Sequence, residues 1–237
     1  MLNIGRLIMS LLNTVNATKT ETKRELAKAK TRQALLRSAL QLYSVEGVCG
    51  MSMNKIAKGA GIAQPSFYNH FASLEGLQNE LSTQLKQNYL SPMRMAWIDM
   101  LKDYATLPKE AFNQRCQHCL TMIFDAAFQN IALFQRLIED SLRFDLQAEN
   151  KGLESLITEI RDEWSKIFIQ GLQSAECSFD ESDVNLCVDM ATAQVHELIL
   201  GCHQGRYSRQ QAIEILCKNF DGLFNSFFTK DKRRLDG

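Results

Sequence analysis

Proline and glycine are scarce in this sequence, which holds three prolines and 12 glycines in 237 residues. Low-complexity disordered chains and collagen-like repeats are rich in these two residues, so the composition excludes both classes. Runs in which Val, Ile and Thr alternate with polar residues are also few, whereas Leu, Ala, Gln, Lys and Glu are abundant. We therefore predict an all-α protein with enough apolar residues for a sizeable core.

Long apolar runs and the sequence signatures of common enzymes are absent as well. No stretch approaches the roughly 20 apolar residues that cross a membrane, and the first residues lack the usual shape of a secretory signal. The sequence contains no G-x-S-x-G, no glycine-rich phosphate loop and no H-E-x-x-H. We expect a cytoplasmic protein that does not touch membranes, is not an enzyme and has no cofactor.

The seven cysteines do not indicate a disulfide framework, because such frameworks are typical of short secreted chains. The sequence CQHC, from Cys116 to Cys119, could suggest a metal site or a redox pair. No second cysteine pair follows at the spacing of a zinc ribbon, and one helix alone cannot surround a zinc ion. We expect free thiols and no metal site, with thiol sensing as an alternative.

The formal net charge of zero conceals a basic front and an acidic remainder. Residues 1–90 hold 11 Lys and Arg against 5 Asp and Glu, which leaves 16 against 22 for the rest of the chain. This asymmetry indicates that only the front faces a polyanion, although a solvated basic surface would show the same excess. We predict a flexible basic N-terminal extension over residues 1–30 that can lie against phosphates.

Apolar spacing predicts a first helix after this extension. Leu35, Ala39 and Tyr43 form one stripe of a helix over residues 31–46, and Gly47 follows as a stop.

A second, short helix is predicted to begin at Ser52, which is a suitable N-cap. Ile56 and Ala60 are its inward positions, and Gly61 supplies the left-handed residue that ends it. Short helices joined by a tight glycine turn are typical of the helix-turn-helix motif.

The stretch GIAQPSFYNHF, residues 61–71, predicts the second helix of that motif. Pro65 suits the first turn, and Phe67 faces inward. The polar side chains then point outward, where Gln and Asn can pair with adenine edges and Tyr and His can donate to phosphates. The alternative is that the aromatic and histidine side chains pack in the core. The predicted DNA-contacting residues are Lys30, Arg32, Ser52, Gln64, Pro65, Ser66, Tyr68, Asn69 and His70.

A longer helix is predicted to follow the motif. Ser73 is its N-cap, and Leu77, Leu81 and Leu85 recur at four-residue steps before the helix stops at Pro92. This helix is long enough to join two domains, and we place a helix-turn-helix domain at residues 31–77.

These segments resemble the TetR family of transcriptional regulators in order and spacing. The resemblance rests on TRQALLRSALQLYSVEG and MSMNKIAKGAGIAQPSFYNHFASLEGL, within residues 31–81. It implies backbone contacts by Ser52, Tyr68 and His70, and base contacts by Gln64, Ser66 and Asn69. Leu74 stands where the family often has a phosphate-contacting lysine, so that contact is not implied.

Residues 78–237 are predicted to form one larger helical domain, because apolar residues keep helical spacing and no repeat or linker interrupts them. The resemblance implies that this domain binds a ligand and dimerises, although an ordinary large core fits the ligand-pocket spacing equally well. The predicted pocket residues are Phe112, Cys116, Cys119, Ile123, Phe124, Phe134, Leu137, Trp164 and Phe168. The predicted dimer-interface residues are Ala191, Val195, Leu198, Ile213, Leu216, Phe220, Leu223, Phe224 and Phe227.

The sequence therefore predicts a homodimeric repressor that binds a pseudo-palindromic operator in double-stranded DNA. A small hydrophobic effector is expected to release it, because the pocket residues are apolar. A weak similarity to the fatty-acid-biosynthesis repressors of the family suggests an acyl chain or acyl thioester. The alternatives are an effector-independent architectural DNA-binding protein and a thiol-based redox-sensing regulator. Glu139 and Asp140 are expected on a solvated face rather than in a catalytic carboxylate pair.

Overall fold

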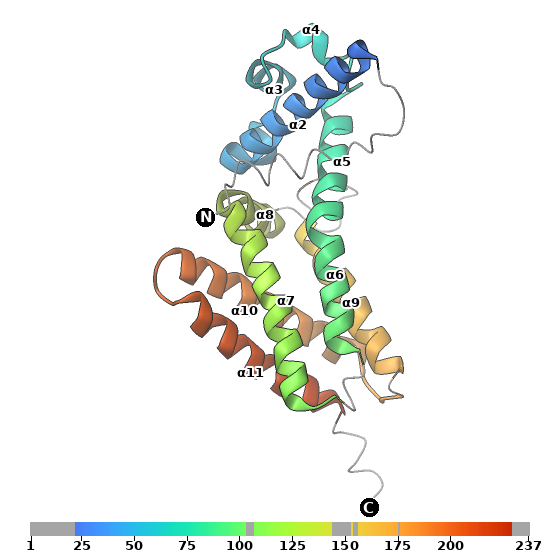
Figure 1. Cartoon of the computed structure of the whole chain (residues 1–237), viewed down its shortest axis with the longest axis vertical. Helices are drawn as coiled ribbons and strands as arrows, with labels where there is room; N and C mark the ends of the chain where they lie inside the picture. The colour runs from blue at the N-terminus through green and yellow to red at the C-terminus, as the bar shows by residue number, and fades with distance from the viewer. Residues whose placement is uncertain (1–21, 103–106, 144–152, 154–155, 175, 229–237) are drawn as a thin grey trace, which may run out of the picture. The chain divides into compact units, whose positions relative to one another are not determined.

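The computed structural model describes residues 22–102, 107–143, 153, 156–174 and 176–228. Every regular element in these ranges is a helix, which confirms the predicted all-α class (Figure 1). Residues 1–21 of the predicted extension lie outside the described residues.

The described residues divide into two compact units. The first unit takes its residues from Met1–Asn88 and Ala132–Leu156, and the second from Tyr89–Ile131 and Ile157–Gly237. This division differs from the predicted boundary at residue 78, because a segment within the predicted C-terminal domain groups with the first unit.

The first unit contains the helix-turn-helix elements and one helix from later in the chain. Its first helix begins eight residues earlier than the predicted start at residue 31, because Thr22 and Glu25 form a capping box. Gly47 interrupts this helix with a φ of 70°, close to the predicted stop. The elements are α2 (Lys23–Gly50), α3 (Met53–Gly59), α4 (Gln64–Phe67), α5 (Leu74–Leu85) and most of α8 (Ile131–Arg143).

Apolar side chains from successive helices form the core of the first unit. The buried set is Leu35, Leu36, Ala39, Tyr43, Ile56, Ala57, Phe67, Phe71, Leu77 and Leu81. A hydrogen bond from Ser38 Oγ to the carbonyl oxygen of Ile56, 2.9 Å long, joins α2 to α3. The apolar stripes predicted from sequence therefore converge on one core.

The prediction that the helix after Ser73 stops at Pro92 is wrong. A π-helical segment, η1 (Lys86–Leu90), follows α5, and α6 (Ser91–Leu101) continues directly from it. Proline removes an intrahelical hydrogen bond and clashes with the preceding turn, whereas it is tolerated in a first turn. Pro92 is the second residue of α6, so it lies in a first turn, and the π-helical segment directly before it changes the hydrogen-bond pattern at that point.

Within the described ranges, the second unit consists of α6 and four further helices. The elements that complete it are α7 (Lys109–Gln129), α9 (Leu156–Ser174), α10 (Glu181–His203) and α11 (Arg209–Phe228). Helix α7 packs against α6 and α11, and α10 packs against α11 (Figure 1). None of the helices in the described ranges has both the length and the hydropathy to cross a membrane.

Candidate nucleic-acid interface and effector cavity

The helix-turn-helix geometry is set by caps at the predicted positions. Ser52 Oγ accepts a hydrogen bond from the amide of Lys55 at 3.3 Å, and Gly61 adopts a φ of 74°. Helix α4 then begins after Ala63, with Pro65 as its second residue. Phe67 is fully buried and fixes this four-residue helix to the core.

The predicted DNA-reading side chains share the outer side of this motif. Gln64, Pro65 and Asn69 are exposed, and Ser66 is half-buried. Tyr68 is 53 % exposed although its ring contacts Phe67 edge-on, at a centroid distance of 5.9 Å. Tyr68 is therefore not a core aromatic, and the turn after α4 presents a polar surface with an aromatic hydroxyl.

His70 lies at the edge of this surface and is half-buried. Burial lowers the pKa of its imidazole, and the positive charges of Lys28 and Arg32 lower it further. The neutral form is thus favoured near neutral pH, which makes this side chain a hydrogen-bonding group rather than a cation.

The two basic residues predicted to contact DNA, Lys30 and Arg32, lie in different environments. Lys30 is exposed on α2. The guanidinium of Arg32 instead pairs with Glu80 and donates to the carbonyl oxygen of His70. These contacts direct its donors into the first unit, while the predicted phosphate contact of Arg32 stays a prediction.

Comparison with known proteins matches residues 35–81, which run from α2 into α5, to the family model "Bacterial regulatory proteins, tetR family". Residues 35–81 thus form a DNA-binding domain of the TetR type. The HTH-type transcriptional regulator RutR of Escherichia coli K12 is 28 % identical over 144 residues, which cover 57 % of this chain and 64 % of RutR. UidR of the same organism is 31 % identical over 91 residues, which cover 36 % and 46 %. The match thus spans less than two thirds of either relative.

Solved structures resemble this chain over most of its length. A TetR-family transcriptional regulator from Streptomyces coelicolor has a TM-score of 0.55 at 18 % identity, covering 86 % of this chain and 84 % of its own. The fatty acid degradation regulator FadR of Bacillus halodurans has a TM-score of 0.51 at 14 % identity, with coverage of 84 % and 95 %. At these identities the likeness shows the fold alone, a helix-turn-helix domain followed by a helical domain.

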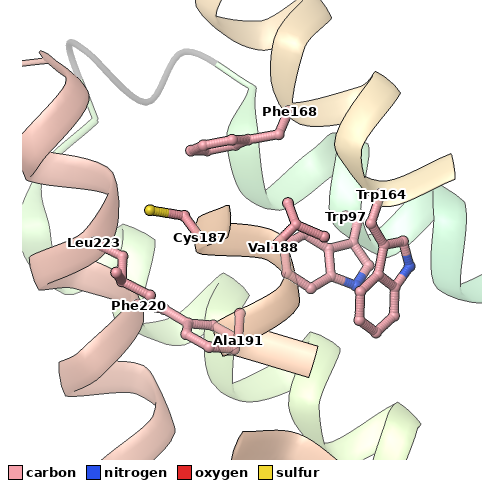
Figure 2. Close-up of a pocket in the computed structure, with 8 residues that line it drawn as sticks. All are labelled: Trp97, Trp164, Phe168, Cys187, Val188, Ala191, Phe220 and Leu223. Carbon is pink, nitrogen blue, oxygen red and sulfur yellow. The ribbon is translucent and has the colours of Figure 1, made fainter. Parts of the chain in front are cut away.

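An aromatic cavity lies in the second unit (Figure 2). Its volume of about 20 Å³ is close to that of one water molecule. Trp97 and Trp164 lie against each other with ring centroids 4.9 Å apart, and the buried Nε1 of Trp97 has no hydrogen-bond partner within the described ranges. The lining residues are Trp97, Trp164, Phe168, Cys187, Val188, Ala191, Phe220 and Leu223.

Only two of the nine predicted pocket residues, Trp164 and Phe168, line this cavity. Leu137 is buried and Phe134 half-buried on α8, and both belong to the first unit. The others are buried on α7, namely Phe112, Cys116, Cys119, Ile123 and Phe124. Sequence reasoning missed Trp97, Cys187 and Val188, because periodicity does not reveal which buried stripes leave a gap between them.

The thiols of the CQHC sequence are buried and poorly ionised. Burial raises the pKa of Cys119 to about 12. Cys116 hydrogen-bonds to Cys217 on α11, and this bond and burial raise the pKa of the Cys116 thiol. Since the thiolate is the reactive form, these environments disfavour thiol sensing by Cys116 and Cys119. No cluster of metal-binding side chains occurs in the parts of the chain that the structure describes.

The residues predicted for the dimer interface mostly face the interior of their own subunit. Ala191, Val195, Ile213, Leu216, Phe220 and Phe227 are buried, and Leu198 and Leu223 are half-buried. The side chain of Phe224 lies outside the described residues. Large apolar side chains are exposed instead at Leu186, Met190 and Ile215, with exposed fractions of 60 %, 47 % and 49 %. Helices α10 and α11 therefore remain candidates for the interface, through the exposed side chains of Leu186, Met190 and Ile215 instead of the predicted residues.

Asp140 on α8 also departs from the prediction. Its side chain is 3 % exposed rather than solvated, and its Oδ2 has no hydrogen-bond partner among the residues described. The neighbouring Glu139 is exposed and pairs with Arg136 at 2.9 Å, so the two carboxylates do not form a pair.

Proposed function

We propose that this TetR-family regulator binds operator DNA through the exposed side of α4 and the turn that follows it. The observation that carries the proposal is the exposed polar surface of Gln64, Tyr68 and Asn69. The buried Phe67 fixes this surface to the core of the domain that matches the family. Amide groups of Gln64 and Asn69 suit adenine edges in the major groove, and the hydroxyl of Tyr68 suits a phosphate.

A second copy of the chain completes the proposed DNA-binding unit. Leu186 and Met190 lie one turn apart on α10, and Ile215 lies on α11, which packs against α10. Exposed apolar side chains on two packed helices suit a two-fold interface. Two copies would place their recognition helices in successive major grooves, about 34–36 Å apart, on a pseudo-palindromic operator.

Variants at two neighbouring exposed positions test the DNA-binding proposal. Tyr68→Phe removes a hydroxyl that contacts phosphate, so we expect a similar loss of affinity, roughly 3- to 10-fold, on every operator variant. Asn69→Ala removes a base contact and should change the preferred base at one position by about 1–3 kcal/mol. Titrating each variant against a set of single-base operator variants separates the two outcomes. An equal loss on all sequences for both variants would remove Asn69 from the base-reading residues.

The cavity of the second unit is the proposed effector site. Its apolar aromatic lining suits a hydrophobic ligand. The Nε1–H of Trp97, which has no partner among the residues described, could donate to one acceptor group. An acyl chain or acyl thioester exceeds about 20 Å³, so binding requires a wider conformation. A ligand with higher affinity for that conformation would release DNA if the same conformation binds the operator poorly.

Tryptophan fluorescence tests the effector proposal directly, because the only two tryptophans of the chain, Trp97 and Trp164, both line the cavity. Medium- and long-chain acyl thioesters should change the emission and raise the Tm. Ala191→Phe fills the cavity and should abolish the response, whereas Gln117→Phe at an exposed position of α7 should preserve it. An unchanged spectrum and Tm with every chain length would rule out acyl thioesters and favour an architectural DNA-binding protein.

A further inference from the structure

Arg32 connects three parts of the first unit. Its Nε donates to Glu80 Oε1 at 3.2 Å, and its Nη2 pairs with the other carboxylate oxygen. Its Nη1 donates to the backbone carbonyl of His70, and its guanidinium lies 4.1 Å from the centroid of the Phe71 ring. One side chain of α2 thus holds both α5 and the turn that follows α4.

The turn after α4 requires support of this kind. Helix α4 has four residues, and such a short helix is not stable by itself. Two backbone hydrogen bonds, from the amides of His70 and Phe71, end on the carbonyl of Phe67, at 2.9 and 3.0 Å. Phe67 anchors this turn from the core side, and Arg32 anchors it through the His70 carbonyl.

We propose that Arg32 and Glu80 are positioning residues for DNA recognition. Glu80 orients the guanidinium with a two-oxygen contact, and the guanidinium fixes the backbone of His70 so that Tyr68 and Asn69 face the groove. Arg32 does not contact phosphate itself. The inference rests on the proposed DNA binding by α4.

Glu80→Gln distinguishes the positioning role of Arg32 from a direct phosphate contact, because the two predict opposite changes in DNA affinity. If Arg32 bound phosphate, Glu80→Gln would free the arginine, remove a negative charge and strengthen DNA binding. The positioning role predicts the opposite, a loss of specific affinity of about 10-fold, because the guanidinium loses its charged partner. Glu75→Gln is the matched control, since it makes the same change at an exposed position of α5 and should not weaken binding. Stronger binding by Glu80→Gln would overturn the proposal.

Arg32→Lys tests whether a positive charge at this position is enough for full DNA affinity. Lysine keeps the positive charge but cannot reach both carboxylate oxygens and the His70 carbonyl. We expect specific affinity to fall about 10-fold while the slope of log affinity against log salt stays unchanged. Lys30→Gln, at an exposed position of the same helix, should instead reduce that slope by about one if Lys30 contacts phosphate. Full affinity with Arg32→Lys would contradict the positioning role.

Hydrogen exchange without DNA keeps this test independent of the proposed function. Arg32→Lys and Glu80→Gln should speed amide exchange in residues 66–71, with α7 and α11 unchanged. Unchanged exchange in residues 66–71 would overturn the positioning role of Arg32 and Glu80 even if DNA binding were lost. Failure of the unmodified protein to bind any DNA would reject the proposed function. Faster amide exchange in the two variants would still show that Arg32 and Glu80 hold the turn after α4.

Discussion

Met190→Glu should convert the protein to a monomer and lower its affinity for a two-half-site operator roughly 100-fold. Met190 is 47 % exposed, one turn from Leu186, and the proposed interface would remove both side chains from water. Burying an unpaired carboxylate in such an interface costs several kcal/mol, while the same carboxylate is well solvated in the monomer. Half-sites then bind separately, and the gain from linking two recognition helices is lost.

Sedimentation velocity and DNA titration measure the two parts of this prediction. Gln114→Glu is a suitable control, because it adds the same charge at an exposed position of α7. The control should remain dimeric and bind DNA with nearly unchanged affinity. A Met190→Glu protein that stays dimeric would place the interface on another surface.

Acidification should reduce stability through His196 on α10. Burial lowers the pKa of its imidazole to about 4, from an ordinary value of 6.5. Between these pH values the unfolded chain binds a proton that the folded chain does not, so the free energy of unfolding falls as pH decreases. A difference of about 2.5 pKa units corresponds to at most about 3 kcal/mol, which is fully lost once the pH is below about 4.

His196→Gln removes this titration and isolates its contribution from that of the carboxylates. Urea unfolding at several pH values should show a shallower fall between pH 6.5 and 4 than in the unmodified protein. Parallel curves for His196→Gln and the unmodified protein would show that His196 is solvated in the folded state.

The helix-turn-helix could be predicted because its signals are local. Ser52 caps α3, Gly61 takes the left-handed conformation, and Pro65 lies in the first turn of α4, each as its residue type requires. The misplaced helix end has a local cause as well. Proline usually stops a helix, but the π turn before Pro92 lets α6 continue.

The remaining differences are tertiary and have no local signal. The basic charge of Arg32 predicted a phosphate partner, whereas its actual partner, Glu80, is 48 residues away. Apolar spacing identified stripes of apolar side chains on α10 and α11. It did not distinguish the side chains buried within the subunit from those exposed on its surface. The cavity similarly depends on the meeting of Trp97 and Trp164, which lie on different helices.

The central claim, sequence-selective DNA binding by the first unit, is tested most directly by titrating the protein against a labelled fragment of its own upstream DNA at several salt concentrations. The account predicts a saturable complex at least about 1,000-fold tighter than with random DNA, with affinity that falls steeply as salt rises. Equal affinity for random DNA and for every genomic fragment tested would contradict it.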